Sequence, residues 1–305
     1  MLLTALTLAT LPAISQSLPP GRFIFTGGAD HVYRWMDDSM TGWPTPWPIL
    51  GPLGGWAGDI AIHQGLLYVV VPYEDKIVRS TLDGTDVTTV LEGSGLYPHS
   101  LAFDQGGNLW FSTYDEEGSQ DGSTQGIWRI ENADPEVTPA LIIGGDRLER
   151  MSPRARGYRF NVPPTIRFAP WSNALHISGL ADCLVGRADP PGYDEIRPLI
   201  EFGDHVESPV GDFVFTPAGE ILFADWLGGT IERYSSAGTW RSVFASVRYA
   251  NRVAVDASGW VYVTGRIYRS GNEREVLTVF RPNGDEWLTI PLSDIFAVAV
   301  WGQEP

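Results

Sequence analysis

One sequence repeat of three predicted strands recurs along almost the whole chain, and this recurrence limits the folds that the sequence can adopt. Each copy has an apolar strand, a Gly-containing turn, a second strand rich in Val, Tyr, Trp or Phe, a short acidic loop and a third strand that usually ends in Arg. The clearest copies are Asp59–Ile62, Leu66–Val70 and Lys76–Arg79; Ser100–Phe103, Asn108–Phe111 and Gly126–Arg129; Asp212–Phe215, Glu220–Asp225 and Thr230–Arg233; and Arg252–Val255, Trp260–Val263 and Leu277–Arg281. A period of about 40 residues built from short strands is typical of a β-propeller.

The remaining strands bring the expected number of blades to six. A degenerate copy of the repeat lies at Ile166–Phe168, Ala174–Ile177 and Cys183–Val185. The first copy lacks its first strand and consists of a second strand, Arg22–Thr26, and a third strand, His31–Arg34. The segment Ile295–Trp301 reads as a first strand with nothing after it. Joining the two ends would complete the last blade and remove the open sheet edges. The sequence therefore predicts an all-β, six-bladed propeller in which the N- and C-terminal strands share one blade.

Turn residues and composition fit this fold. Third strands are followed by Leu82–Gly84, Ser236–Gly238 and Pro282–Gly284, which suit the positive φ of tight hairpins. With 34 Gly and 23 Pro in 305 residues and no long amphipathic helical pattern, the chain reads as turn-dense. Because the repeat spans nearly all of it, we expect one domain over residues 19–305.

The net charge and the N-terminal sequence limit the partners and the cellular location that we expect for the protein. A net charge of −16 argues against nucleic acid as a partner and disfavours anionic membranes. The single cysteine, Cys183, rules out an internal disulfide. Residues 1–18 carry a short apolar run with a small-x-small site near Ala13–Ser15, which predicts a secretory signal peptide and a secreted or secretory-pathway protein. The run is too short to span a bilayer, so no membrane insertion is expected.

The innermost strand of each blade lines the central channel of a propeller, so the residues just before it should ring the channel mouth. Aligning the six first strands places Gly58, His99, Pro164, Gly211, Asn251 and Phe296 at that position, followed by Asp59, Ser100, Thr165, Asp212, Arg252 and Ala297. The loops between second and third strands should reach the same face, and they supply Asp30, Tyr73–Asp75, Tyr114–Glu117, Asp182, Asp225, Trp226 and Arg266.

Each of these residues also has a structural interpretation. An Asp in such a loop commonly caps backbone N–H groups of a tight turn, and this applies most strongly to Asp225. His63, His176 and His205 are expected to be surface or packing residues. His99 differs, because a His directly before a channel strand has no role in a turn, and we favour a functional role there.

Two segments resemble known propeller families. Tyr97–Phe111 resembles the repeat of NHL and streptogramin (virginiamycin B) lyase propellers, in which Pro-His-Gly-Ile-Ala precedes Gly-Asn-Leu-Trp-Phe. The six-blade count and Ala250–Val255 resemble the gluconolactonase/senescence-marker-protein family, whose Asn-Gly-Leu-Ala phrase supplies a metal-ligand Asn.

The second resemblance implies a divalent cation, commonly Ca²⁺, held in the channel by one Glu, two Asn and one Asp. The resemblance implies that Asn251 corresponds to one of the two Asn ligands, and that Asp212 or Asp225 corresponds to the Asp ligand. The family Glu is replaced by Gly58 or Phe296, depending on blade assignment. Pro164 and Gly211 occupy the candidate positions for the second Asn.

The 12 Trp residues suggest an aromatic cavity. Trp43 and Trp47 lie in a Pro-rich segment without a strand pattern, so we expect a loop there that covers a pocket or packs beneath the ring. Such a cavity suits an apolar organic ligand.

Two classes of function remain open at this stage. The first is an enzyme on a small cyclic organic substrate at the channel mouth, either a lactonase-like hydrolase or a metal-independent natural-product cyclase (of pericyclase or Diels–Alderase type) or lyase. The other is a non-catalytic NHL-type binding propeller. For an enzyme, the expected catalytic residues are His99, Asn251, Arg252 and Tyr73, and the expected substrate-binding residues are Tyr114, Asp182, Trp226, Arg266 and Phe296.

Overall fold

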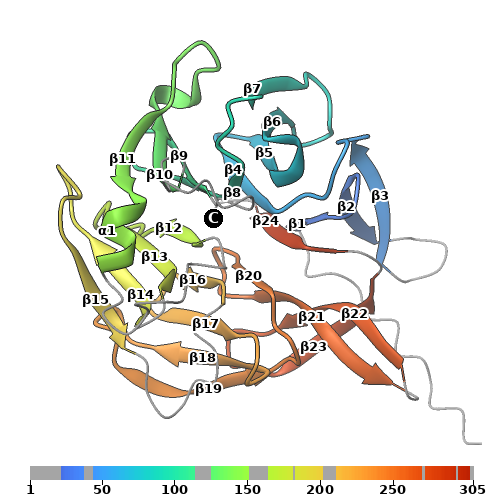
Figure 1. The fold of residues 1–305 in the computed structure, drawn as a ribbon. Helices are drawn as coiled ribbons and strands as arrows, with labels where there is room; N and C mark the ends of the chain where they lie inside the picture. The colour runs from blue at the N-terminus through green and yellow to red at the C-terminus, as the bar shows by residue number, and fades with distance from the viewer. Residues whose placement is uncertain are drawn as a thin grey trace, which may run out of the picture.

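Six four-stranded sheets surround a common axis in the computed structural model of the chain (Figure 1). The structure describes residues 22–37, 44–113, 125–150, 164–180, 183–201, 211–269, 272–292 and 295–302. Every sheet is antiparallel and follows the chain order outward from the axis, apart from the blade that both chain ends share. The six-bladed propeller predicted from the sequence is confirmed.

The blades are numbered here from the one that contains the N-terminal strands. Blade 1 consists of β24 (Ala297–Gly302), β1 (Arg22–Gly27), β2 (Val32–Asp37) and β3 (Pro44–Leu50); blade 2 of β4 (Asp59–His63), β5 (Leu66–Val71), β6 (Lys76–Thr81) and β7 (Thr88–Glu92); blade 3 of β8 (Pro98–Phe103), β9 (Leu109–Thr113), β10 (Gly126–Ile130) and β11 (Ala140–Gly144). Blade 4 consists of β12 (Ile166–Phe168), β13 (Leu175–Leu180), β14 (Cys183–Ala188) and β15 (Ile196–Glu201); blade 5 of β16 (Phe213–Phe215), β17 (Ile221–Asp225), β18 (Thr230–Tyr234) and β19 (Trp240–Ser246); blade 6 of β20 (Arg252–Val255), β21 (Val261–Arg269), β22 (Asn272–Phe280) and β23 (Glu286–Pro291).

Ring closure joins the two ends of the chain in blade 1. The C-terminal strand β24 is innermost and pairs with β1 from Arg22↔Gly302 to Gly27↔Ala297. Because β24 takes the place of a first strand, the inner edge of β1 is not left unpaired. This confirms the predicted closure by N- and C-terminal strands.

The core lies between blades. Buried apolar side chains form clusters at the six junctions; Phe25 and Leu67 share the one between blades 1 and 2, and Trp110 and Leu175 share the one between blades 3 and 4. Second strands are covered on both faces, as the buried β5 and β17 show. Each blade therefore depends on its neighbours for burial of its apolar faces.

Tight turns behave as the sequence predicts. Gly84, Gly238 and Gly284 have φ between 78° and 91°, in the region that favours glycine. A Cβ on Gly84 or Gly238 would also overlap a backbone carbonyl oxygen of the preceding blade, at Ile49 or Leu199. These turns thus fix the approach of one blade to the next.

The Pro-rich segment is not the expected loop. Residues Pro44–Leu50 form β3, the outermost strand of blade 1, and Trp47 is 60% exposed there, away from the axis. Edge strands tolerate proline, because their outward N–H groups need no partner. Trp43 and the predicted signal peptide at residues 1–18 lie outside the described residues.

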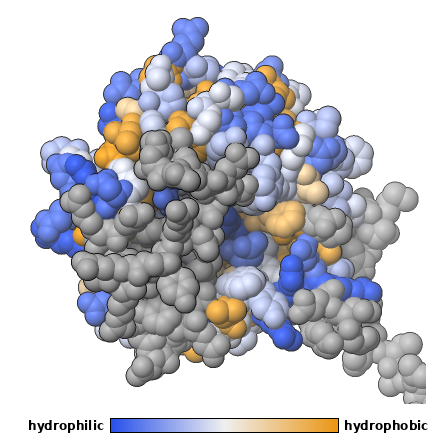
Figure 2. Space-filling model, in the orientation of Figure 1, coloured by the Kyte–Doolittle hydropathy of each residue, from blue (hydrophilic) through white to orange (hydrophobic). Residues whose placement is uncertain are grey.

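Helical segments are few and short in the described part of the chain: α1 (Gly145–Arg150), η1 (Pro72–Glu74) and η2 (Glu131–Ala133). None of them has the length and apolar character that crossing a lipid bilayer requires. The visible face mixes hydrophilic residues with scattered hydrophobic ones outside the residues left grey (Figure 2).

Candidate functional site

His99 occupies a β-bulge at the start of the innermost strand of blade 3. Pro98 pairs with Thr113 and Ser100 with Ser112, so His99 is the extra residue between two consecutive pairs. Bulges of this kind redirect a side chain. His99 is only 5% exposed, and it lies at the end of the channel that the sequence alignment predicts.

Rim carboxylates organise the loops that lead to this end of the channel. Asp75, in the loop after β5, accepts hydrogen bonds from the backbone N–H groups of Gly95, Leu96 and Tyr97, directly before β8. Asp30 accepts from the N–H groups of Leu53 and Gly54 at 2.8 Å each, before β4. The structural interpretation of the rim Asp residues is therefore correct for these two.

Trp56 is the centre of an aromatic cluster around His99. Its ring lies 5.2 Å from that of Phe296, 5.8 Å from that of Tyr73 and 6.2 Å from that of His99, all with tilted or edge-on geometry. The sequence singled out His99, Tyr73 and Phe296 separately, and the structure brings them together. Trp56 was not assigned to the site, although it stands two residues before the aligned position Gly58.

Electrostatics keep the imidazole of His99 neutral. Burial, followed by the positive charge of Arg252, lowers its pKa from 6.5 to about 4. The Arg252 side chain donates from Nη2 to the Gly58 carbonyl oxygen at 3.1 Å. A neutral histidine beside a guanidinium can accept a proton, while the guanidinium stabilises the negative charge that proton removal creates.

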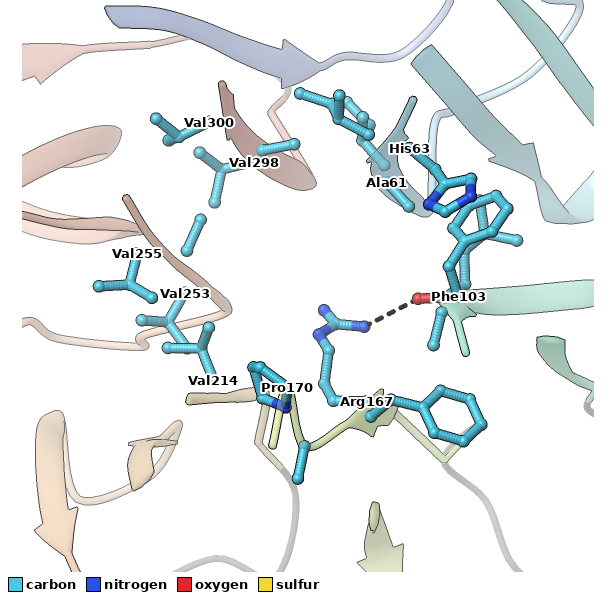
Figure 3. Close-up of a pocket in the computed structure, with 18 of the residues that line it drawn as sticks. Ala61, His63, Phe103, Arg167, Pro170, Val214, Val253, Val255, Val298 and Val300 are labelled. Carbon is cyan, nitrogen blue, oxygen red and sulfur yellow. Dashed lines mark hydrogen bonds between the residues drawn. The ribbon is translucent and has the colours of Figure 1, made fainter. Parts of the chain in front are cut away.

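A second arginine crosses the channel just below this cluster. Arg167, in β12, donates from Nη1 to Asp59 at 3.2 Å and from Nη2 to Asp212 at 3.0 Å. It also donates to the Leu101 carbonyl oxygen, and its side chain reaches into the space enclosed by the inner strands (Figure 3). Together with Arg252, these residues form a charge layer of two guanidiniums and two buried carboxylates.

The carboxylates of this charge layer fasten neighbouring blades. Asp59 accepts from the N–H of Leu101 in blade 3, and Asp212 accepts from the N–H of Val253 in blade 6. Ser100, at the equivalent position of blade 3, accepts from the N–H of Ile166 in blade 4. The alignment thus predicted correctly which positions begin the innermost strands. At Asp59, Ser100 and Asp212, however, the side chains connect neighbouring blades.

The charges within the layer act on one another. Burial raises the pKa of Asp212 above its ordinary value. Burial acts in the same direction on Asp59, but the charges of Arg167 and Arg252 outweigh it and hold the pKa of Asp59 below its ordinary value. For Asp212 burial prevails, and the negative charge of Asp59 raises its pKa further.

The residues expected to bind a metal do not fit a cation site. Asp212 already binds Arg167, whose positive charge opposes a divalent cation at the same carboxylate. Asp225 is fully buried and accepts from the N–H of Gly228 in its own turn, as its capping interpretation predicts. Within the described ranges, no three His, Cys, Asp or Glu residues gather as metal ligands, and Asn251 alone does not make a site.

The other predicted residues lie apart from His99 or outside the described residues. Trp226 packs on Tyr249 at 5.4 Å, and the Arg266 guanidinium lies 5.9 Å from the same ring, so both belong to a separate cluster between blades 5 and 6. Tyr114, Asp182 and His205 lie outside the described residues. His63 stacks on Phe103, and His176 packs on Phe215, as expected for packing residues.

The opposite half of the channel contains a cavity of about 560 Å³ (Figure 3). All six blades contribute to it from the second halves of their innermost strands, and its walls include Val214, Val253, Val255, Val298 and Val300. None of the predicted catalytic residues lines it. The charge layer lies between this valine cavity and the His99 cluster.

No protein-family model and no curated protein matches this sequence. Solved structures do match its fold. A chain of a nidogen/laminin complex aligns with a TM-score of 0.69 at 12% identity, covering 92% of this chain and 98% of that one. A gluconolactonase from Xanthomonas campestris gives 0.57 at 16% identity, covering 92% and 91%. The virginiamycin B lyase of Staphylococcus aureus, in a catalytically inactive variant solved with quinupristin, gives 0.52 at 14% identity, covering 92% and 85%.

The likeness is one of fold. Both propeller types that the sequence resembles, the gluconolactonases and the streptogramin lyases, are among the structural neighbours of this chain. At these identities the comparisons establish the shared architecture, and the chemistry has to be argued from the site.

Proposed function

We propose that this protein is a propeller enzyme of the lactonase/lyase-like type that opens a small cyclic ester without a metal ion in its channel. The observation that carries the proposal is the buried, neutral His99 between Trp56 and the charge of Arg252. In this proposal His99 is the proton acceptor, and Arg252 stabilises the negative charge that develops on the substrate carbonyl.

The surroundings of His99 suit a flat or cyclic organic molecule. Trp56 and Phe296 offer apolar faces, and the exposed Tyr73 adds a hydroxyl at the edge of the cluster. Asn251, directly before Arg252, is half-buried and is our candidate for a hydrogen bond to the substrate. Aromatic walls with few polar groups are typical of pockets for small organic ligands.

Two ring-opening reactions are compatible with this arrangement. In an elimination, one carbon of the substrate bears the leaving ester oxygen, and His99 would take a proton from the neighbouring carbon. A C=C bond would then form between these two carbons, and the C–O bond would break to leave a carboxylate. In a hydrolysis, His99 would take a proton from water, whose oxygen attacks the ester carbonyl. The acyl C–O bond would then break, and the leaving alcohol oxygen would take the proton from His99. We favour elimination, because the donor set at the channel end does not suit a cation that would polarise a lactone carbonyl. The virginiamycin B lyase supports a role for a histidine, since replacing one of its histidines by alanine gives the variant named as inactive.

The test compares two buried histidines. His176 matches His99 in burial and in a pKa near 4, but it packs in blade 4 against Phe215. We expect purified protein to open a member of a panel of simple lactones and cyclic depsipeptides, quinupristin included. His99→Asn should lower kcat/KM at least 100-fold, while His176→Asn should change it less than threefold in the folded fraction.

Product mass separates the reactions, because hydrolysis adds one water and elimination adds none. Activity should survive a chelator such as EDTA. Loss of activity to the chelator, or equal activity in His99→Asn and the parent, would contradict the proposal. A protein that turns over no member of the panel yet tolerates His99→Asn would point instead to a binding propeller.

A further inference from the structure

We propose that the valine cavity is a second ligand site, for a small uncharged hydrocarbon-rich molecule that carries one hydrogen-bond acceptor. This cavity is defined by Val214, Val253, Val255, Val298, Val300 and Arg167. It lies at the opposite end of the channel from His99, and the proposal does not depend on the function assigned to His99.

The size and walls of the cavity suit a bound molecule. Its volume of about 560 Å³ falls within the range of about 300–1,000 Å³ that is usual for small-molecule pockets. Valine side chains line one side, and Ala61, His63 and Phe103 line the other, as Figure 3 shows. Removal of apolar ligand surface from water is favourable, so a hydrocarbon ligand gains free energy of binding by filling this space.

Arg167 supplies a hydrogen-bond donor to the cavity, whose other polar lining residues are His63, Asp104 and Gln105. Its side chain is 20% exposed although both of its carboxylate partners are buried, and it is one of the cavity-lining residues. Within the described part of the chain, Nη2 donates to Asp212 only, so its second N–H has no described acceptor. A guanidinium has five N–H donors, and one of them is thus available to a ligand.

The charge of the layer decides which acceptor fits. Arg167 and Arg252 are balanced by Asp59 and Asp212, so the end of the cavity has donors but little net positive charge. A carboxylate ligand would approach two buried carboxylates and meet repulsion from them. A ketone, ester or amide oxygen would accept from Arg167 without that penalty.

The first experiment locates the site. The probe is 6-propionyl-2-dimethylaminonaphthalene (prodan), which is uncharged, carries a carbonyl oxygen, and fluoresces at shorter wavelength in apolar surroundings. We expect saturable binding with a blue shift. Val255→Phe and Val300→Phe, which fill the cavity from blades 6 and 1, should each weaken binding at least tenfold. Their circular dichroism and melting temperature establish that each variant is folded.

Control variants at the other end of the channel are His99→Asn and Phe296→Ala. Both should bind prodan within twofold of the parent, because neither residue lines the cavity. Unchanged binding in both valine variants, weakened binding in the controls, or no saturable binding in the parent would overturn the assignment. Because His99→Asn is also the test of the proposed ring-opening activity, failure of one proposal leaves the other measurable.

The second experiment tests the acceptor with ligands of equal shape. We expect 2-acetylnaphthalene to displace prodan at a several-fold lower concentration than 2-isopropenylnaphthalene, in which a CH₂ group replaces the carbonyl oxygen. The isopropenyl compound is the more hydrophobic, so this order requires a hydrogen bond. We expect 2-naphthoate to be the weakest of the three. Tightest binding by the isopropenyl compound or by the carboxylate would overturn the inferred ligand class.

Discussion

At the scale of single residues, burial gives His99 a protonation behaviour that kinetics can detect. An ordinary histidine loses its function as a base below pH 6.5, but the pKa of His99 is about 4. If His99 is the base, kcat/KM should stay nearly constant from pH 7 to pH 5 and fall only as the pH approaches 4. The measurement is a pH–rate profile with far-UV circular dichroism at each pH. An acid limb centred near pH 6.5 in folded protein would contradict the assignment.

Arg167 is the residue on which the charge layer depends. Arg167→Met would leave the buried carboxylates of Asp59 and Asp212 without their shared partner, which should lower the free energy of unfolding by about 3–5 kcal/mol. Adding Asp212→Asn should recover part of this loss, because one uncompensated charge is removed. Urea unfolding of the parent, both single variants and the double variant gives the coupling energy. Additive effects of the two substitutions would show that the pair does not interact.

The charge layer also shows what sequence reasoning missed at this scale. Asp59 and Asp212 stood out as carboxylates at equivalent positions, but nothing local says that an arginine from blade 4 reaches both. Trp56 was likewise recognisable only as one of several Trp residues, because its three aromatic neighbours come from η1, β8 and the segment before β24. Such contacts between side chains of different blades depend on closure of the ring.

At the scale of elements, the turns between third and fourth strands set the spacing of blades. Gly84 has φ of 82°, and a Cβ there would overlap the Ile49 carbonyl oxygen, whereas Gly65 has φ of 75° with open space around it. Gly65→Ala should therefore cost about 1–2 kcal/mol for the left-handed conformation alone, and Gly84→Ala clearly more. Urea unfolding of the two variants side by side measures the difference. Equal losses would mean that the approach of blades 1 and 2 is not fixed by this turn.

Elements were the part of the fold that the sequence predicted best. Alternating apolar residues and positive-φ turn glycines are local signals, so the three inner strands of each blade could be predicted. The outermost strand of each blade was not predicted, and the structure adds it to all six sheets. The error at β3 has the same origin, because Pro44, Pro46 and Pro48 resemble a loop locally. Only its position as the outer edge of blade 1 makes the segment a strand.

At the scale of the whole molecule, closure through β24 should make folding all-or-none. A chain that ends at Ile295 would lack the strand that pairs with β1 over residues 22–27. It should lose its cooperative urea transition, whereas removal of residues 303–305 alone should leave the transition unchanged. A cooperative transition at the parental midpoint in the shorter chain would show that the ring does not need β24.

The buried histidines should make the folded state sensitive to acid. His99 and His176 titrate near 6.5 when unfolded but near 4 when folded, so the unfolded state binds more protons between these values. Stability is therefore fully present above pH 6.5 and should fall as the pH drops toward 4, by about 3 kcal/mol for each histidine. Urea unfolding at pH 7 and pH 4.5 measures the loss. His176→Asn should show a smaller loss than the parent, and an identical loss would contradict this origin.

Pairing of Arg22 with Gly302 has a consequence for how the protein can be attached to a support. Both described ends of the chain leave the ring at the same point, beside Asp256, which binds Arg22 at 2.7 Å and follows the cavity residue Val255. A carrier or solid support attached directly before Arg22 or after Gly302 would therefore lie at the cavity end of the ring. The aromatic side with His99 would face outward, accessible to whatever diffuses past.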